Sequence, residues 1–297
     1  MPMAMVKIKA KVKTKMAKII DGKAISKAER EKIAKEAEEL KNSGILPGLA
    51  VIIVGDDPAS AVYVRNKERA CEEAGIYSEV IRMPENASEE EIIANIEALN
   101  ANGKIHGILV QLPLPKGLDE TKILSHIKAS KDVDAFLPEN VGLLSLGRPD
   151  MLPCTPAGVM TLLAESGIDV CGKECVVVGR SNIVGKPMAM LLLLQNGTVT
   201  VCHSKTKNIA DITRRADILV CAVGKPKFIT ADMVKSGACV IDVGINRGDD
   251  GKLCGDVDFE NVKEIAGYIT PVPGGVGPMT ITSLLKNTVK SAKNSQK

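Results

Sequence analysis

The stretch Val176-Val177-Val178-Gly179-Arg180-Ser181-Asn182-Ile183-Val184-Gly185-Lys186-Pro187 decides the fold of the second half of the chain. An apolar, β-branched run ends at Gly179, a second glycine follows at Gly185, and an apolar segment begins at Met188. A strand, a glycine turn and a helix in this order bring backbone N–H groups and the positive end of a helix to a dinucleotide phosphate. The order here is G-x-S-x-x-x-G rather than G-x-G-x-x-G, so a tight turn without a ligand is the alternative. The candidate cofactor residues are Gly179, Arg180, Ser181, Val184 and Gly185.

The next strand indicates which dinucleotide is bound. Thr198-Val199-Thr200-Val201-Cys202 alternates and is β-branched, which predicts the second strand of the same unit. An Asp or Glu at that strand end would bind the ribose hydroxyls of NAD, but the chain continues His203-Ser204-Lys205-Thr206-Lys207. A 2′-phosphate can accept hydrogen bonds from Ser204 and Thr206 and can pair with Arg180. The sequence therefore favours NADP over NAD, with a basic surface loop as the alternative.

The rest of this half continues the same sheet. The runs 218–224 and 238–244 are apolar and end in glycine, as strands do where their tips approach a cofactor. We add Ile245, which follows the second run, to the candidate cofactor residues. The stretch 271–278 holds three glycines among three prolines, which predicts a stiff loop without a helix against a flat ligand. A last helix is predicted from about Thr280 to Lys293.

The composition indicates a globular enzyme with room for two domains. Of the 297 residues, 45% are apolar and 25% are charged. The net charge of +3 comes from lysines that precede Asp21, so the rest of the chain is slightly acidic and gives no reason to expect nucleic acid. No run reaches the roughly 18 apolar residues of a membrane span. The eight cysteines lack a C-x-x-C pair and the three histidines are far apart, so we expect no metal site. We expect the cysteines to be free thiols and the protein to be cytoplasmic.

The first half of the chain also alternates predicted helices and strands. We expect residues 1–18 to be a disordered basic extension, because lysine alternates there with small and apolar residues. A helix follows from Ala24 to Ser43, a buried strand from Leu49 to Gly55 and another strand from Tyr77 to Met83. Ser88-Glu89-Glu90-Glu91 is a capping box that opens the next helix. The predicted inward residues of the helix from Ala24 to Ser43 are Ile25, Ala28, Ile33, Ala37 and Leu40.

Two further segments carry polar side chains at positions suited to a site. Tyr63 and Lys67 are four residues apart on a predicted helix, so they share a face, although a surface aromatic–lysine pair would look the same. Gln111 stands where the buried run 105–112 meets a turn, at the strand end where open α/β sheets bind ligands. An amide that braces the loop is the alternative for Gln111.

These segments together resemble the bifunctional methylenetetrahydrofolate dehydrogenase / methenyltetrahydrofolate cyclohydrolase family. The resemblance runs from about Ile19 to the C-terminus, and six motifs in the same order are more specific than any one of them. One loop departs from the family, which usually has Asp-Gly-Phe-His where this chain has Asp134-Ala135-Phe136-Leu137. The motifs are Tyr63 to Lys67, Val110 to Pro115, Lys131 to Asp134, Pro153 to Pro156, Gly179 to Pro187 and Pro271 to Thr280.

The resemblance implies an α/β fold with two domains. An N-terminal α/β domain (residues 19–154, joined by the C-terminal helix 279–297) would bind folate. A Rossmann-type domain with a doubly wound parallel sheet (155–278) would bind NADP. The family's catalytic lysine corresponds to Lys67, with Tyr63 stacking on the folate, Gln111 next to the lysine and Asp134 on the pterin. The resemblance also implies substrate contacts by Val110, Leu112, Pro273, Gly274 and Gly275.

The implied activity is oxidation of 5,10-methylenetetrahydrofolate with NADP⁺, followed by hydrolysis of the methenyl product to 10-formyltetrahydrofolate. Tetrahydrofolate derivatives would be the partners, and the family implies a cytoplasmic homodimer that binds neither nucleic acid nor membranes. Two alternatives remain among enzymes: a dehydrogenase-only relative, and another Rossmann oxidoreductase of the shikimate-dehydrogenase type. A nucleotide-binding regulatory protein with a dead site is a third, which the presence of Lys67 and Asp134 disfavours.

Overall fold

The computed structural model describes residues 16–248 and 250–296. The elements of the first half are β1 (Lys18–Ile19), α1 (Gly22–Asn42), β2 (Gly48–Val54), α2 (Pro58–Glu73), β3 (Tyr77–Met83), α3 (Glu89–Ala101), β4 (Gly107–Val110), α4 (Glu120–Leu124), η1 (Ala129–Lys131) and α5 (Pro138–Ser145). The elements of the second half are α6 (Cys154–Glu165), β5 (Glu174–Val178), α7 (Gly185–Leu194), β6 (Thr198–Cys202), α8 (Ile209–Thr213), β7 (Ile218–Cys221), η2 (Ala231–Met233), β8 (Cys239–Asp242), β9 (Asn246–Arg247), β10 (Leu253–Cys254), α9 (Phe259–Val262), β11 (Tyr268–Ile269) and α10 (Val276–Asn294).

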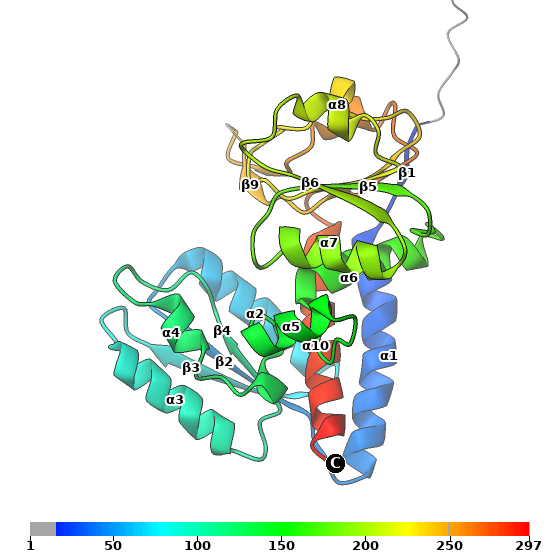
Figure 1. Cartoon of the computed structure of the whole chain (residues 1–297). Helices are drawn as coiled ribbons and strands as arrows, with labels where there is room; N and C mark the ends of the chain where they lie inside the picture. The colour runs from blue at the N-terminus through cyan, green and yellow to red at the C-terminus, as the bar shows by residue number, and fades with distance from the viewer. Residues whose placement is uncertain (1–15, 249, 297) are drawn as a thin grey trace, which may run out of the picture.

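A three-stranded parallel sheet in the order β3-β2-β4 forms the centre of the first domain (Figure 1). All seven residues of β2 are buried, as expected of a parallel strand covered on both faces. Leu49, Val51 and Ile53 pack with residues of α1, α2 and α10. The alternate residues of β2 pack against α3 and α4 on the other face. The period of two along β2 therefore builds two cores from one strand.

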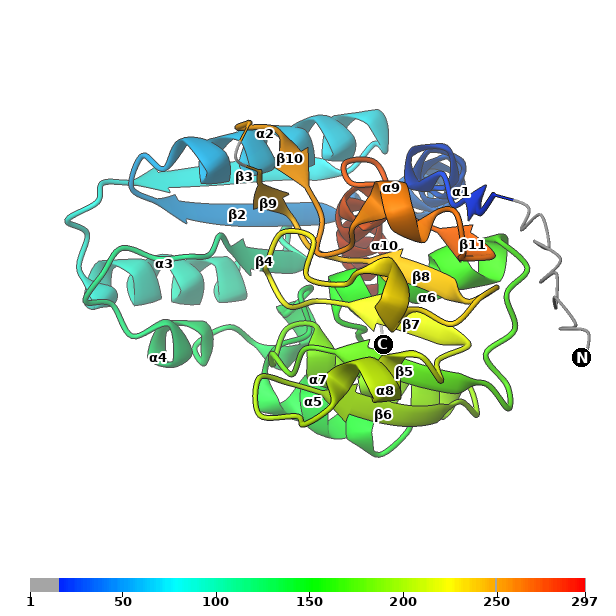
Figure 2. The same cartoon turned by 90° about the horizontal axis from the view of Figure 1, so that it is seen from above.

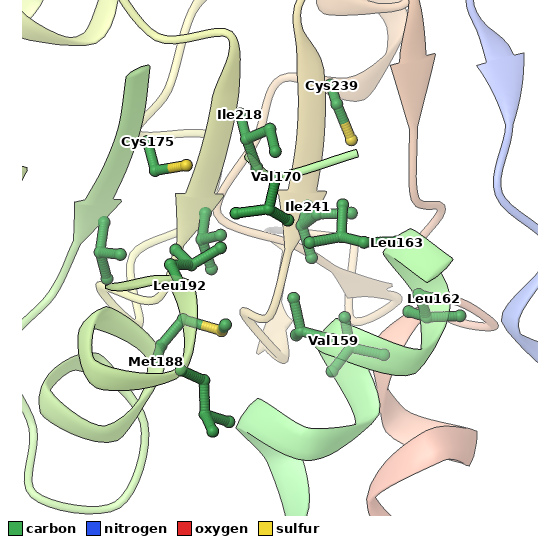
Figure 3. Packing of buried hydrophobic residues seen from close by; sticks show 14 of the residues in the cluster. Val159, Leu162, Leu163, Val170, Cys175, Met188, Leu192, Ile218, Cys239 and Ile241 are labelled. Atoms are coloured by element: carbon green, nitrogen blue, oxygen red, sulfur yellow. The ribbon is translucent and has the colours of Figure 1, made fainter. Parts of the chain in front are cut away.

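The second domain is organised by a six-stranded sheet in the order β1-β11-β8-β7-β5-β6, whose pairings are all parallel. Strand order reverses beside β5, as in doubly wound folds. On one face, Cys175 and Ile218 pack against Met188 of α7 and Val159 of α6 (Figure 3). This confirms the predicted Rossmann-type arrangement.

Two long helices connect the domains. Helix α10 packs along α1 and α6, and it also contacts α2, β2 and β4 of the first domain. Seen from above, the two sheets lie on either side of α10 (Figure 2). Because α10 contacts elements of both domains, it joins the two sheets.

The N-terminal boundary differs from the expectation. The last residues of the expected extension are ordered: the backbone N–H of Ala17 donates to Lys263 O at 2.8 Å, and Lys18 begins β1 at the edge of the six-stranded sheet. The first strand of the chain therefore belongs to the second domain's sheet. A strand of two residues has no periodicity, which explains why sequence analysis missed it. Residues 1–15, expected to be disordered, lie outside the described residues.

Two helix predictions also need correction. Ala28 was expected to face inward on α1 but is exposed, and Ser26 and Glu29 are buried instead. The Oγ of Ser26 lies 2.8 Å from Oγ1 of Thr282, so polar contacts join α1 and α10. Helix α10 begins at Val276, inside the stretch expected to be free of helix. Gly22, at the start of α1, packs closely against this stretch, since a Cβ on Gly22 would lie 1.9 Å from the Gly275 carbonyl oxygen.

Candidate active site

Helix α2 carries Tyr63 and Lys67 one turn apart. The helix begins at Pro58, and the carboxylate of Asp57 caps it by accepting from the Ser60 N–H at 2.7 Å. Tyr63 is 41% exposed, whereas Lys67 is half-buried. Side chains four residues apart lie on one face of a helix. This face of α2 therefore presents an aromatic ring next to a partly desolvated amine.

Gln111 follows β4 and reaches the same amine. Its Oε1 accepts a hydrogen bond from Nζ of Lys67 at 2.9 Å, and its own Nε2 donates to the carbonyl of Leu112 at 2.7 Å. The amide contacts the lysine and braces the turn, so the loop-bracing interpretation of Gln111 is confirmed, while a ligand contact stays a prediction. Val110, one residue earlier, is only 4% exposed and its side chain packs in the core.

The charge of Asp134 acts on Lys67. Burial lowers the pKa of Lys67, and the charge of Asp134 opposes this by raising it. Burial likewise raises the pKa of Asp134, while Lys67 and a hydrogen bond with the Cys154 thiol lower it. The structure thus brings Lys67, Gln111 and Asp134 into one electrostatic unit, in which the lysine loses its proton more readily than a lysine in water.

The loop that departs from the family pattern contains one strained residue, Ala135, and one buried apolar residue, Leu137. Ala135 has φ of +58°, a conformation that costs a residue with a Cβ about 1–2 kcal/mol. The side chain of Leu137 is 6% exposed and packs among apolar residues of the first domain. Its backbone N–H donates to Asp132 at 2.9 Å. The loop is therefore anchored by apolar burial and by Asp132 rather than by a polar side chain at position 137.

A cavity of about 680 Å³ lies next to this unit, where α1 and α2 meet loops of the second domain. Its lining includes Tyr63, Ile245, and the predicted substrate residues Pro273, Gly274 and Gly275, but not Lys67, Gln111 or Asp134. Tyr63 is the predicted residue common to the cavity and to the lysine face of α2. The predicted folate residues thus fall into two groups that meet at Tyr63.

The predicted phosphate turn has the expected strand–turn–helix form. Ser181 Oγ accepts from the N–H groups of Val184 and Gly185 at 3.1 and 3.3 Å, so it caps α7. A Cβ on Gly179 would lie 2.2 Å from the Ala222 carbonyl oxygen, and its φ is +135°. Gly179 is therefore required by the packing of β5 against the neighbouring loop. Arg180 is exposed beside the turn.

In the loop after β6, the two candidate hydroxyls, of Ser204 and Thr206, have different environments. Thr206 Oγ1 accepts from the His203 N–H at 2.8 Å and so braces the loop. Ser204 is exposed. Of the two, Ser204 is the side chain available to a ligand at this sheet edge.

Sequence analysis missed two buried acids that shape the end of the second sheet. Asp256 is fully buried and accepts from the N–H groups of Val223, Gly224 and Lys225 at 2.6, 3.1 and 2.9 Å. Asp242, at the end of β8, accepts from the Asp256 N–H at 2.9 Å, and burial raises its pKa to about 7. Asp242 stands inside the apolar run 238–244 and Asp256 stands among mixed residues, so neither differs in the sequence from an acid in a surface turn.

Comparison with known families covers both domains. Residues 20–134 match the model of the tetrahydrofolate dehydrogenase/cyclohydrolase catalytic domain, and residues 153–296 match the NAD(P)-binding domain of the same family. The chain belongs to the tetrahydrofolate dehydrogenase/cyclohydrolase family. Membership over both domains disfavours the alternative of a shikimate-dehydrogenase type.

Individual members of the family are similar over nearly the whole chain. The bifunctional protein FolD of Acetivibrio thermocellus is 63% identical over 277 residues, which are 93% of this chain and 97% of the relative. The crystal structure of the bifunctional enzyme FolD of Campylobacter jejuni has a TM-score of 0.92 at 53% identity, covering 94% and 99% of the two chains. The Trypanosoma brucei enzyme, solved with NADP cofactor and inhibitor, has a TM-score of 0.91 at 42% identity, covering 95% and 99%.

Within residues 16–248 and 250–296, no helix is both long and apolar enough to cross a bilayer. The same ranges contain no group of three or more His, Cys, Asp or Glu placed to hold a metal ion.

Proposed function

We propose that this protein oxidises 5,10-methylenetetrahydrofolate to the methenyl form with NADP⁺ and then hydrolyses that product to 10-formyltetrahydrofolate. The contact that carries the proposal is the 2.9 Å hydrogen bond between Lys67 and Gln111, with Asp134 acting on the same amine. The family membership gives this contact its chemical setting. The T. brucei relative, whose structure contains NADP, supports the choice of cofactor.

The residues of the second domain fit a phosphorylated dinucleotide. The turn from Gly179 to Gly185 has no room for side chains at its ends, because a Cβ on Gly185 would lie 2.3 Å from the Gly179 carbonyl oxygen. We assign the pyrophosphate to this turn and to the N-terminus of α7, and the 2′-phosphate to Ser204 and Arg180. When bound, NADP⁺ supplies the hydride acceptor. Ile245, a predicted cofactor residue, lines the same cavity as the predicted folate residues Tyr63 and Gly274.

In the first step, the chain has only to position the reactants, because transfer of hydride from the methylene carbon moves no proton. Tyr63 offers its ring to the folate and Asp134 accepts hydrogen bonds from the pterin. In the second step, water adds to the methenyl carbon and loses one proton to solvent; the carbon–nitrogen bond then opens, the remaining hydroxyl gives up its proton as the formyl carbonyl forms, and the ring nitrogen gains a proton. Lys67, whose pKa is lowered by burial, serves as the group that takes and returns this proton.

The test is to give the purified protein the methylene substrate and follow its products by absorbance and chromatography. We expect NADPH and 10-formyltetrahydrofolate to form together with NADP⁺. If the methenyl compound accumulates and disappears only at its uncatalysed rate of hydrolysis, the protein is instead a dehydrogenase-only relative. Absence of NADPH formation would overturn the whole proposal.

We also propose a cytoplasmic homodimer that pairs through β6. This strand is the edge of the six-stranded sheet, and apolar side chains near it are exposed. Leu193 of α7 is 57% exposed and Val201 of β6 is 38% exposed. The free cysteines, six of them buried, suit a reducing compartment. Sedimentation should show a dimer that Leu193→Asp converts to monomers, and a monomeric wild-type protein would contradict this.

A further inference from the structure

Helix α10 begins at one group of predicted folate residues and then passes the other. Gly274 and Gly275 lie directly before its first residue, Val276. Asn287 stands 12 residues after Gly275, about 18 Å along the helix axis. At this level α10 lies beside the first domain, where it contacts β4 and η1 (Figure 1). The loop that carries Asp134 follows η1, so one helix serves both groups of predicted folate residues.

Asn287 uses both hydrogens of its side-chain amide to hold this part of the first domain. Its Nδ2 donates to the Val133 carbonyl oxygen at 2.8 Å and to the Leu152 carbonyl oxygen at 2.8 Å. Both partners are acceptors, so the contacts themselves identify the nitrogen of the amide. The side chain is buried, so bulk water does not compete for these bonds. Asn287 therefore ties together two segments that are separate in the chain.

The bond to Val133 fixes the backbone of Asp134. A peptide unit is planar, so the Val133 carbonyl and the Asp134 N–H belong to one rigid group. The thiol of Cys154 donates to the same carbonyl oxygen at 3.2 Å, and a carbonyl has two lone pairs to accept both donors. Cys154 begins α6, two residues after Leu152. The second bond of Asn287 thus holds the segment from which this other donor reaches the loop.

The orientation of Asp134 matters for the substrate. In the proposed function its carboxylate accepts hydrogen bonds from the pterin, and hydrogen bonds weaken steeply when donor and acceptor lose their alignment. We propose that Asn287 is a positioning residue for folate binding, which acts through the Val133 carbonyl to hold Asp134 in the orientation that the pterin requires. The inference rests on the proposed function, because it needs the pterin to bind Asp134.

The next residue of α10 provides a matched control. Thr288 is fully buried, and its Oγ1 donates to the Leu284 carbonyl oxygen within the same helix at 2.9 Å. Thr288→Val keeps the branched shape of the side chain and removes this bond, but leaves the contacts of Asn287 in place. A loss that both variants share would come from a weaker α10. A loss confined to the Asn287 variant would come from the loop.

The test measures KM and kcat for methylenetetrahydrofolate and for NADP⁺ in wild type, Asn287→Leu and Thr288→Val. Leucine has a similar branched shape but no donor, so the two carbonyls lose their partner. In Asn287→Leu we expect the KM for the folate to rise about tenfold, the scale of one hydrogen bond to a charged group, and the KM for NADP⁺ to change less than about twofold. Thr288→Val should change neither. If Asn287→Leu does not fold, Asn287→Ala leaves room for a water that donates to the carbonyls, and should show the same pattern at smaller size.

A double-mutant cycle shows whether Asn287 acts through Asp134. Asp134→Ala removes the carboxylate, so adding Asn287→Leu to it should change the folate KM by less than about twofold, because effects that share one group are not additive. Additive losses would overturn the inference. So would an unchanged folate KM in Asn287→Leu, or equal losses for the folate and NADP⁺. Absence of turnover in the wild type would overturn the proposed function instead.

Discussion

Nζ of Lys67 donates to Oε1 of Gln111 at 2.9 Å, and the orientation of that amide is fixed by the hydrogen bond from its Nε2 to the Leu112 carbonyl. An amide oxygen accepts from an ammonium group and from a neutral amine alike. Gln111 therefore holds Lys67 in place in both protonation states without favouring the charged form as a carboxylate would. A lysine that must exchange a proton during turnover needs such a neutral partner.

Lys67→Met should separate the two activities. Methionine keeps much of the apolar stem but has no titratable group, so hydrolysis should fall by roughly a hundredfold to ten-thousandfold, the usual contribution of a general acid–base group. Hydride transfer moves no proton and should survive in part. The methenyl intermediate should accumulate, which absorbance spectroscopy can follow. If both activities fall by the same factor, Lys67 only positions the substrate.

Asp134→Asn should move the pH dependence of hydrolysis to lower pH. In the proposed mechanism the neutral amine of Lys67 is the active base, so the rate should rise as pH rises through the pKa of Lys67. The Asp134 charge raises that pKa, and its removal leaves burial to lower it without opposition. The measurement is kcat for the saturating methenyl substrate against pH, corrected for uncatalysed hydrolysis. A midpoint that stays in place or moves to higher pH would show that another group titrates.

The strands were predictable from the sequence because their signal is local. The run that became β2 is apolar throughout, and the structure buries all of it. The predicted strand from Tyr77 to Met83 matches β3 at both ends. The Ser88 capping side chain also accepts from the Glu91 N–H. Each of these features depends on neighbours within a few residues.

The misses depend on partners that are distant in the chain. Ser26 is buried because its hydroxyl forms a hydrogen bond with Thr282, which is 256 residues away in the chain. No periodicity of α1 reveals that contact. Lys18 forms a strand only because Tyr268 lies next to it in the sheet. The site of Lys67 was found by resemblance to a family, since its partner Gln111 is 44 residues away. Helix spacing alone would have left Lys67 on the surface.

Ser204→Glu should remove most of a preference for NADP over NAD. We expect wild-type protein to favour NADP by about tenfold or more in kcat/KM, a difference of about 1.4 kcal/mol. Ser204 is exposed at the end of β6, where a carboxylate would repel a 2′-phosphate and accept from ribose hydroxyls. Lys207→Gln changes the charge of the same loop by one unit and serves as the control. Equal efficiencies with the two cofactors in the wild type would refute the assignment.

Asp256→Asn should loosen the loop that follows β7. The carboxylate of Asp256 accepts three consecutive backbone N–H groups, from Val223 to Lys225, and also the side-chain amide of Asn246 at 2.9 Å. An asparagine there would turn an N–H₂ group toward donors in a fully buried position. We expect a loss of about 3 kcal/mol in the free energy of unfolding.

The local consequence is what distinguishes this role from general destabilisation. Hydrogen exchange in the Asp256→Asn protein should quicken first at the amides of residues 223–225, at temperatures where the first domain is still protected. The KM for NADP should rise, because this loop lies at the carboxyl end of the sheet, where we propose that the cofactor binds, and binding of folate should change less. Asp258→Asn is the control: its carboxylate accepts from the side chain of Asn261 on the surface and should cost under about 1 kcal/mol. Unchanged exchange at residues 223–225 would mean that the loop keeps its shape without Asp256.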